Sequence, residues 1–142
     1  MDTPTFQGND AQGAQQAQKQ PPTILVVENE VSNRILIERV LSTRGYTCIT
    51  ASNGQEALDI LDTQKVDLIL TDLFMPVLDG YRATQLIRAR PGMANIPIVA
   101  VTAFALHDES EAAFQMGCTE YLIKPFKPRQ LLEVVDRLLP RQ

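Results

Sequence analysis

Short apolar segments alternate with amphipathic stretches along most of the chain. Three segments are continuously apolar: Ile24–Val27, Leu68–Leu70 and Ile98–Val101. Continuous apolar runs of this length are typical of strands that are buried on both faces of a parallel sheet. Two weaker segments, Cys48–Ala51 and Tyr121–Ile123, predict two further strands.

The stretches that follow these strands have helical periodicity. They lie around residues 34–41, 57–61, 81–87, 106–116 and 131–139. In the first stretch we expect one apolar face made of Leu36, Ile37, Val40 and Leu41, with Arg34, Glu38 and Arg39 toward solvent. Gly45, Gly117 and Pro140 are the stop signals after the first, fourth and last stretches. The strict alternation of strands and helices predicts an α/β fold, a five-stranded parallel sheet with helices on both faces.

The first 22 residues differ in composition from the rest. They contain six Gln and no Val, Ile or Leu, and Pro21-Pro22 marks their end. Such a segment buries too little apolar surface to offset the entropy of ordering. We therefore predict a flexible Gln/Ala-rich tail over residues 1–22 and one folded domain over residues 23–142.

Charge and hydropathy exclude several classes of protein. The chain has a net charge of −4, and such an acidic domain lacks the basic surface of a protein that binds DNA directly. No run approaches the roughly 18 apolar residues that cross a bilayer, and no signal peptide is evident. We expect a cytoplasmic protein without a membrane segment, in which Cys48 and Cys118 are buried, reduced thiols.

Polar residues follow four of the predicted strands at the point where each strand ends. They are Glu28, Asn29 and Glu30 after the first, Asp72 after the third, Thr102 after the fourth and Lys124 after the fifth. In an open parallel sheet, functional groups gather at the carboxyl ends of the strands. Each residue alone has an ordinary structural explanation as a turn former, a helix cap or a solvated charge. Together they predict a site in which acids bind Mg²⁺ and a nucleophilic carboxylate accepts a phosphoryl group.

Four segments carry a resemblance to a known family. They are ILVVENEVSN from Ile24, LILTDLFMPVLDG from Leu68, IPIVAVTAFA from Ile96 and EYLIKPF from Glu120. From about Thr23 to Leu139 the chain resembles the receiver domains of two-component response regulators, in particular single-domain ones of the chemotaxis and cell-cycle kind. The resemblance implies a (βα)5 flavodoxin-like sheet with strand order 2-1-3-4-5.

The resemblance also implies a role for each matching residue. Asp72 would be the phosphoacceptor, assisted by Thr102 and Lys124, and Tyr121 would be the aromatic switch residue. The Mg²⁺ ligands would be Glu28, Asn29, Asp72 and the backbone carbonyl of Phe74. The Lys124–Pro125 peptide bond would be cis.

The implied activity is that of a phosphorylation switch. Asp72 would accept a phosphoryl group from a histidine kinase or a histidine phosphotransfer protein. The domain would assist its own phosphorylation and dephosphorylation without being an enzyme in the ordinary sense. The chain has no room for an output domain, so the signal would pass to a partner protein through the fourth helix, fifth strand and fifth helix.

Asn29 departs from the family pattern, because Asp is usual at its position. An amide oxygen can coordinate Mg²⁺ but carries no formal charge, so we expect weaker Mg²⁺ binding. This departure motivates an alternative function, a pseudo-receiver that acts as a protein-interaction module without phosphorylation. The presence of Asp72, Thr102 and Lys124 favours the phosphorylated switch.

Overall fold

The sheet has five parallel strands in a computed structural model that describes residues 21–73, 78–103 and 117–139. The strands are β1 (Thr23–Val27), β2 (Thr47–Ala51), β3 (Leu68–Asp72), β4 (Ile98–Thr102) and β5 (Glu120–Ile123). Their spatial order is β2-β1-β3-β4-β5, and all four pairings are parallel. The predicted fold class and strand order are therefore confirmed.

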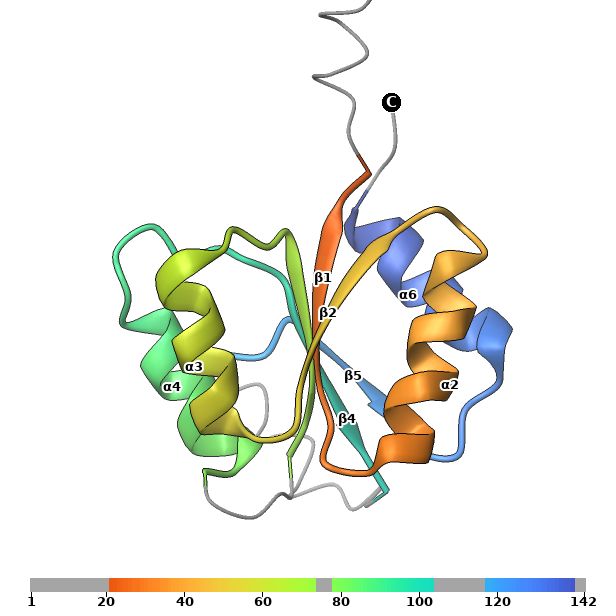
Figure 1. Ribbon diagram of the computed structural model, residues 1–142, viewed down its shortest axis with the longest axis horizontal. Coiled ribbons are helices and arrows are strands. Elements are labelled where there is room, and N and C mark those ends of the chain that lie inside the picture. Colours follow the sequence, from red (N-terminus) through yellow and green to blue (C-terminus); the bar gives the residue numbers. More distant parts are fainter. Residues whose placement is uncertain (1–20, 74–77, 104–116, 140–142) are drawn as a thin grey trace, which may run out of the picture.

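Helices cover both faces of the sheet (Figure 1). Helices α2 (Val31–Ser42) and α6 (Pro128–Leu138) lie on one face, and α3 (Gly54–Thr63) and α4 (Gly80–Arg88) on the other. These four confirm the predicted helices, whereas the helix expected over residues 106–116 falls outside the described residues. Among the described helices, none is long and apolar enough to cross a membrane.

Alternation of side chains along the strands divides the core into two layers. In β1, Leu25 and Val27 pack in the layer that includes residues of α3 and α4. Ile24 and Val26, one position away in each case, pack in the layer that includes residues of α2 and α6. A strand whose neighbouring side chains point to opposite faces needs apolar residues at every position when both faces are covered. This arrangement explains why the strands appear in the sequence as continuous apolar runs.

Helix α2 corrects the predicted apolar face. Ile37 and Leu41 are buried as expected, but Leu36 is 53% exposed. Arg34, expected in solvent, is half-buried. The apolar residues of this helix cover more than one face, and only the face through Ile37 and Leu41 packs on the sheet. Periodicity could not identify which part of so broad an apolar surface would be covered.

Two glycines, at the starts of α3 and α4, allow close contact with the backbone of other segments. The backbone N–H of Gly80 donates to the carbonyl of Leu73, and that of Gly54 donates to the carbonyl of Leu78. A Cβ atom would lie 2.1 Å from the Asp72 carbonyl oxygen at Gly80 and 2.5 Å from the Leu78 carbonyl oxygen at Gly54. Any larger residue would push these backbones apart. The close approach of Gly80 to the end of β3 and of Gly54 to Leu78 therefore depends on the absence of side chains at these two positions.

The two cysteines are free thiols, as predicted, but only one of them is buried as expected. Cys118 is buried and Cys48 is half-buried. Burial, with a contribution from the charge of Glu38, raises the pKa of Cys48 to about 11. The thiolate is the reactive form of cysteine, so Cys48 is unreactive near neutral pH.

Candidate functional site

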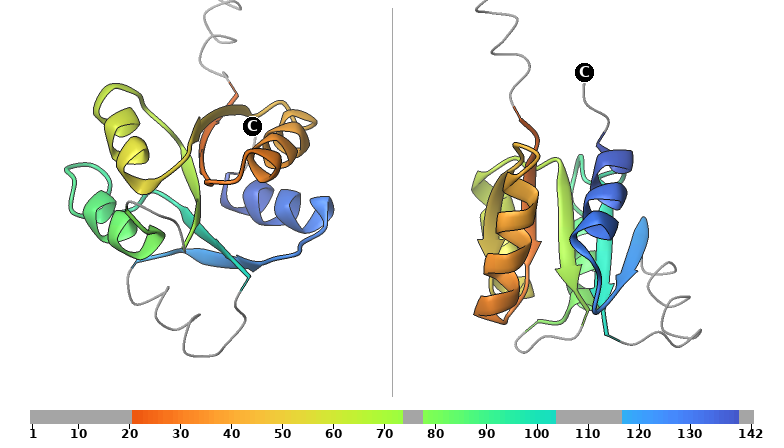
Figure 2. Two further views of the ribbon diagram at one scale, coloured as in Figure 1. Left: turned by 60° about the horizontal axis from the view of Figure 1, so that its bottom comes forward. Right: turned by 90° about the vertical axis from the view of Figure 1, so that its right-hand side faces the viewer.

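The carboxyl ends of the strands meet at one edge of the sheet, which faces forward in the left view of Figure 2. In β1 and β3, Val27 pairs with Thr71, so the next residues, Glu28 and Asp72, follow side by side in register. Thr102 pairs with Ile123 in β5, and its carbonyl accepts the backbone N–H of Lys124 at 2.7 Å. The structure thus brings the predicted acidic, hydroxyl and lysine residues to one edge.

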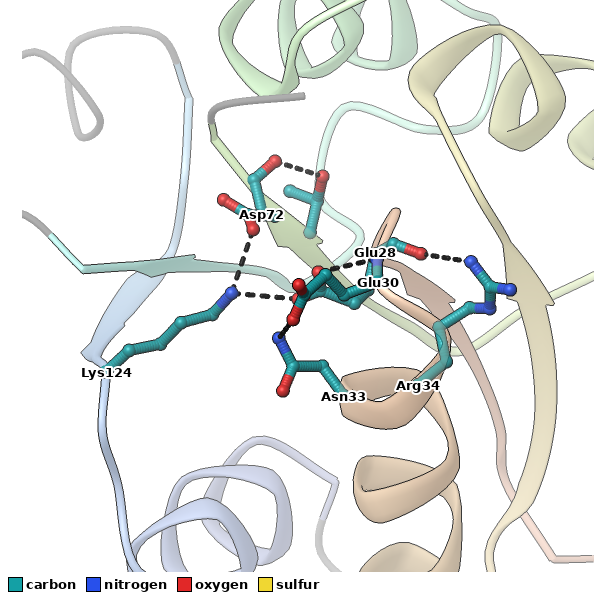
Figure 3. Close-up of polar contacts among 7 residues, drawn as sticks. Glu28, Glu30, Asn33, Arg34, Asp72 and Lys124 are labelled. Atoms are coloured by element: carbon teal, nitrogen blue, oxygen red, sulfur yellow. Dashed lines mark hydrogen bonds and ion pairs between the residues drawn. The ribbon is translucent and has the colours of Figure 1, made fainter. Parts of the chain in front are cut away.

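One ammonium group joins two carboxylates at this edge (Figure 3). Lys124 Nζ lies 2.9 Å from Glu28 Oε1 and 2.9 Å from Asp72 Oδ2. The Glu28 side chain is 3% exposed and that of Asp72 is 12% exposed. Two carboxylates with so little solvent need a cation between them, because their mutual repulsion is weakly screened there. Lys124 provides that charge from the end of β5.

The environment of Lys124 keeps it charged. Burial alone acts to lower the pKa of the ammonium, but the hydrogen bonds that it donates to Asp72 and Glu28, together with their negative charges, outweigh burial. The pKa of Lys124 is therefore raised above its usual value. The positive charge at the site persists throughout the neutral range.

Backbone contacts fix Glu28 in its buried position. The second carboxylate oxygen, Oε2, accepts the backbone N–H of Glu30 at 3.1 Å. The Glu28 carbonyl accepts a hydrogen bond from Arg34 Nη1 at 2.7 Å. No pattern in the sequence indicates this role for Arg34, although its position one turn into α2 places it near the residues that precede the helix. Asn29, in contrast, is exposed.

Of the other predicted site features, the structure describes Thr102, Tyr121 and the Lys124–Pro125 bond but not Phe74. Thr102 is buried, with 2% of its surface exposed. Tyr121 is half-buried in β5, pairs with Ala100 and packs against the core layer of α3 and α4. The Lys124–Pro125 peptide bond is cis, as the family resemblance implied. Phe74, whose carbonyl was expected to bind the metal, lies outside the described residues.

The oxygen donors at the edge suit a magnesium ion. Mg²⁺ prefers hard oxygen ligands and keeps several waters, so one or two carboxylates are sufficient. Glu28 and Asp72 supply two carboxylates, and Asn29 adds an amide oxygen next to Glu28 in the chain. Among the described residues, no group of three or more His, Cys, Asp or Glu is placed to hold a metal. The donor set therefore fits Mg²⁺ bound by few protein ligands, rather than a metal enclosed by protein.

An apolar pocket of about 280 Å³ adjoins the lysine. It is lined by Asn33, Leu36 and Ile37 of α2, by Ala103 after β4, and by Lys124–Phe126. Val31 and Ile35 are also exposed on α2, at 58% and 48%. Asn33 was not among the predicted site residues. Its spacing of three from Glu30, which places both on one side of a helical turn, is the signal that could have identified it.

Comparison with known proteins identifies the family. Residues 24–136 match the response regulator receiver domain. The chain therefore belongs to the receiver domain family of response regulators, whose members accept a phosphoryl group on Asp in two-component signalling. Receiver domains are phosphorylated by histidine kinases.

The relatives include whole regulators and isolated receiver domains. The chain is 38% identical over 118 residues to the "Probable transcriptional regulator ycf27" of Cyanidium caldarium, covering 83% of this chain and 46% of the relative. The chain spans about half the length of the curated relatives that it matches first.

Two solved structures resemble the chain closely. The receiver domain of sensor histidine kinase PA1611 from Pseudomonas aeruginosa PAO1, with a magnesium ion coordinated in its active site cleft, has a TM-score of 0.78 and 39% identity. The alignment covers 83% of this chain and 97% of that domain. Chemotaxis response regulator CheY4 of Vibrio cholerae has a TM-score of 0.80 and 29% identity, covering 84% and 99% of the two chains.

Proposed function

We propose that this protein is a phosphorylation switch that accepts a phosphoryl group on Asp72 from a histidine kinase or a histidine phosphotransfer protein. One observation carries the proposal. The Asp72 carboxylate lies at the carboxyl end of β3 and shares the Lys124 ammonium with Glu28. This arrangement presents a nucleophilic oxygen next to a fixed positive charge and a second acid, which is the chemistry that phosphoryl transfer requires.

The residues divide the chemistry between them. A carboxylate oxygen of Asp72 attacks the phosphorus, and an O–P bond forms while the P–N bond to the donor histidine breaks. The donor imidazole keeps the bonding electron pair and takes up a proton. Lys124 then stabilises the negative charge of the acyl phosphate. A magnesium ion, held by Glu28, Asn29, Asp72 and the Phe74 carbonyl, would supply further charge neutralisation.

The surface around the site provides places for partners. The apolar pocket beside Lys124 and the exposed side chains of Val31, Ile35 and Leu36 adjoin the reactive edge, where a phosphodonor protein must approach. Exposed apolar groups gathered in this way mark interaction surfaces. The helix α2 face would therefore receive the donor.

The output passes through a second surface. Phosphorylation would draw Thr102 toward Asp72 and Tyr121 toward the space that Thr102 leaves. This would bias the surface made by the predicted helix over residues 106–116, β5 and α6, and a downstream protein would bind there. The acidic charge of the chain supports a signalling role without direct DNA contact.

The test is incubation with a small-molecule phosphodonor and Mg²⁺, followed by intact mass measurement. The wild-type protein gains one phosphoryl group, and Asp72→Asn gains none. Asp59→Asn, the same isosteric change at an exposed residue of α3, is the matched control and is labelled like the wild type. Equal labelling of Asp72→Asn would contradict the assignment. Failure of the folded wild type to be labelled at all would favour the pseudo-receiver alternative.

A further inference from the structure

We propose that Glu30 supplies, from just outside the coordination sphere, the negative charge at the magnesium site that Asn29 does not provide. Glu30 would raise the affinity for Mg²⁺ through space, and Asn33 would hold its carboxylate in place. This inference rests on the proposed function, because it concerns the metal that assists phosphorylation of Asp72. Neither Glu30 nor Asn33 is among the ligands that the family resemblance implies.

The backbone of Glu30 is tied directly to the site. Its N–H donates to Glu28 Oε2 at 3.1 Å, and the other oxygen of the same carboxylate accepts from Lys124. Figure 3 shows the Glu30 side chain extending from the start of α2 in the direction of Lys124, in front of Glu28. The charge of Glu30 therefore lies on the side of α2 that faces the reactive edge.

A hydrogen bond restrains the Glu30 carboxylate. Asn33 Nδ2 donates to Glu30 Oε1 at 3.1 Å across one turn of α2. Asn33 also lines the pocket next to Lys124, so the pair stands at the rim of the site. The side chain of Glu30 does not provide the helix N-cap hydrogen bond that its position would permit. Its contact is with Asn33 instead, and its free oxygen remains available to water around a cation.

The charge count explains why such a group matters. Glu28 and Asp72 together carry two negative charges, and Lys124 cancels one of them. With a neutral Asn at position 29, the buried part of the site attracts a divalent cation weakly. Glu30 brings the net charge of the group to two negative charges. Metal affinity in oxygen-ligand sites is tuned by this count.

The exposure of Glu30 indicates that it acts from outside the first shell of ligands. The residue is exposed, one of its oxygens is engaged by Asn33, and no three acids of the described residues are grouped at metal-binding positions. A charge that acts through water is screened by salt, with a Debye length of about 10 Å at 0.1 M ionic strength. A direct ligand would be far less sensitive to salt. Salt dependence therefore separates the two roles.

The experiment is a calorimetric titration of the full chain with Mg²⁺ at low and at high salt. Glu30→Gln weakens binding by about threefold to tenfold at low salt, and the difference from wild type largely disappears at high salt. Glu30→Asp retains most of the affinity because it keeps the charge. Asn33→Ala has a smaller effect in the same direction, since the carboxylate remains but is no longer restrained.

Glu38→Gln is the matched control. It removes the same charge from the exposed surface of α2, about 12 Å further along the helix, and leaves Mg²⁺ affinity unchanged. Equal affinities for Glu30→Gln and Glu38→Gln would overturn the inference alone, provided that wild type binds Mg²⁺. A loss in Glu30→Gln that persists at high salt would also overturn it, since Glu30 would then be a direct ligand. Absence of Mg²⁺ binding by wild type would overturn both the inference and the metal-assisted chemistry of the proposed function.

Discussion

The amino ends of the strands (the amino edge) and their carboxyl ends (the carboxyl edge) each carry a half-buried cation, but use it in opposite ways. At the amino edge, the Arg88 guanidinium donates to the carbonyls of Gly117, Met93 and Ile96 and to the Thr119 hydroxyl. These partners are neutral, and they belong to the segments that lead into β4 and β5. At the carboxyl edge, Lys124 instead holds two carboxylates that repel each other.

The contrast separates stability from function. A hydrogen bond that involves a charged group stabilises a fold more than one between neutral groups, and the amino edge gathers several of them on one side chain. Crowded carboxylates contribute little to the stability of the fold, but they attract a cation and present a nucleophile. Sites that violate the rules of stable packing are expected to be functional. The carboxyl edge is the part of the molecule that meets this description.

Removing the shared cation has the largest expected effect on stability. Lys124→Met leaves Glu28 and Asp72 facing each other without compensation, so the free energy of unfolding falls by about 3 kcal/mol. Millimolar Mg²⁺ restores more stability to this variant than to wild type, because the metal can take the position of the ammonium. Urea denaturation with and without Mg²⁺ measures both effects.

The control for this change is Lys65→Met, which removes an exposed lysine from the turn after α3. It changes the unfolding free energy by no more than about 0.5 kcal/mol. If Lys124→Met were no less stable than Lys65→Met, the two carboxylates would not depend on the shared ammonium.

Removing Arg88, the cation at the amino edge, lowers stability without changing Mg²⁺ binding or phosphorylation. Arg88→Met loses its hydrogen bonds to three carbonyls and a hydroxyl, and we expect a loss of about 2 kcal/mol in unfolding free energy. The Kd for Mg²⁺ and the labelled fraction of the folded protein stay at wild-type values. Arg90→Met is the control, since Arg90 makes only a surface ion pair with Asp62 worth about 0.5 kcal/mol. A changed Kd for Mg²⁺ in folded Arg88→Met would contradict the claim that the amino edge contributes to stability alone.

Adding charge to the carboxyl edge sharpens the same contrast. Asn29→Asp places a carboxylate where the family usually has one, so Mg²⁺ binding tightens by about tenfold. Without metal the variant is slightly less stable, because a third acid joins Glu28 and Asp72. Thermal unfolding with and without Mg²⁺ should show both changes. An unaltered Kd, together with loss of binding in Glu28→Gln, would mean that Glu28 has taken over the ligand role expected of position 29 and that Asn29 does not bind the metal.

The fold could be predicted from the sequence because its strands are buried on both faces. Ile24–Val27 and Ile98–Val101 are apolar at every position, and runs of this short length favour buried strands over helices. The parallel arrangement followed from the alternation with helices. The buried face of helix α2 was harder to predict, since its apolar residues cover more than one face. Only contact with the sheet decides that Leu36 is exposed.

The main residues of the site were predicted, but the contacts that hold them in position were not. Glu28, Asp72 and Lys124 lie at or directly after strand ends, which is a local signal. That Lys124 binds both acids at once depends on the register of β1, β3 and β5, which no local pattern contains. Arg34 was missed for the same reason, since its bond is to a backbone carbonyl that has no signature in the sequence.

The central claim, that the carboxyl edge carries the phosphoacceptor on Asp72, has one most direct test. Phosphorylated protein is treated with borohydride, which reduces an aspartyl phosphate to homoserine, and peptides are then mapped by mass spectrometry. Reduction at residue 72 alone, dependent on phosphodonor and Mg²⁺, is the result we expect. Homoserine at any other Asp, or a phosphoryl group recovered on a hydroxyl side chain such as Thr102, would contradict the assignment.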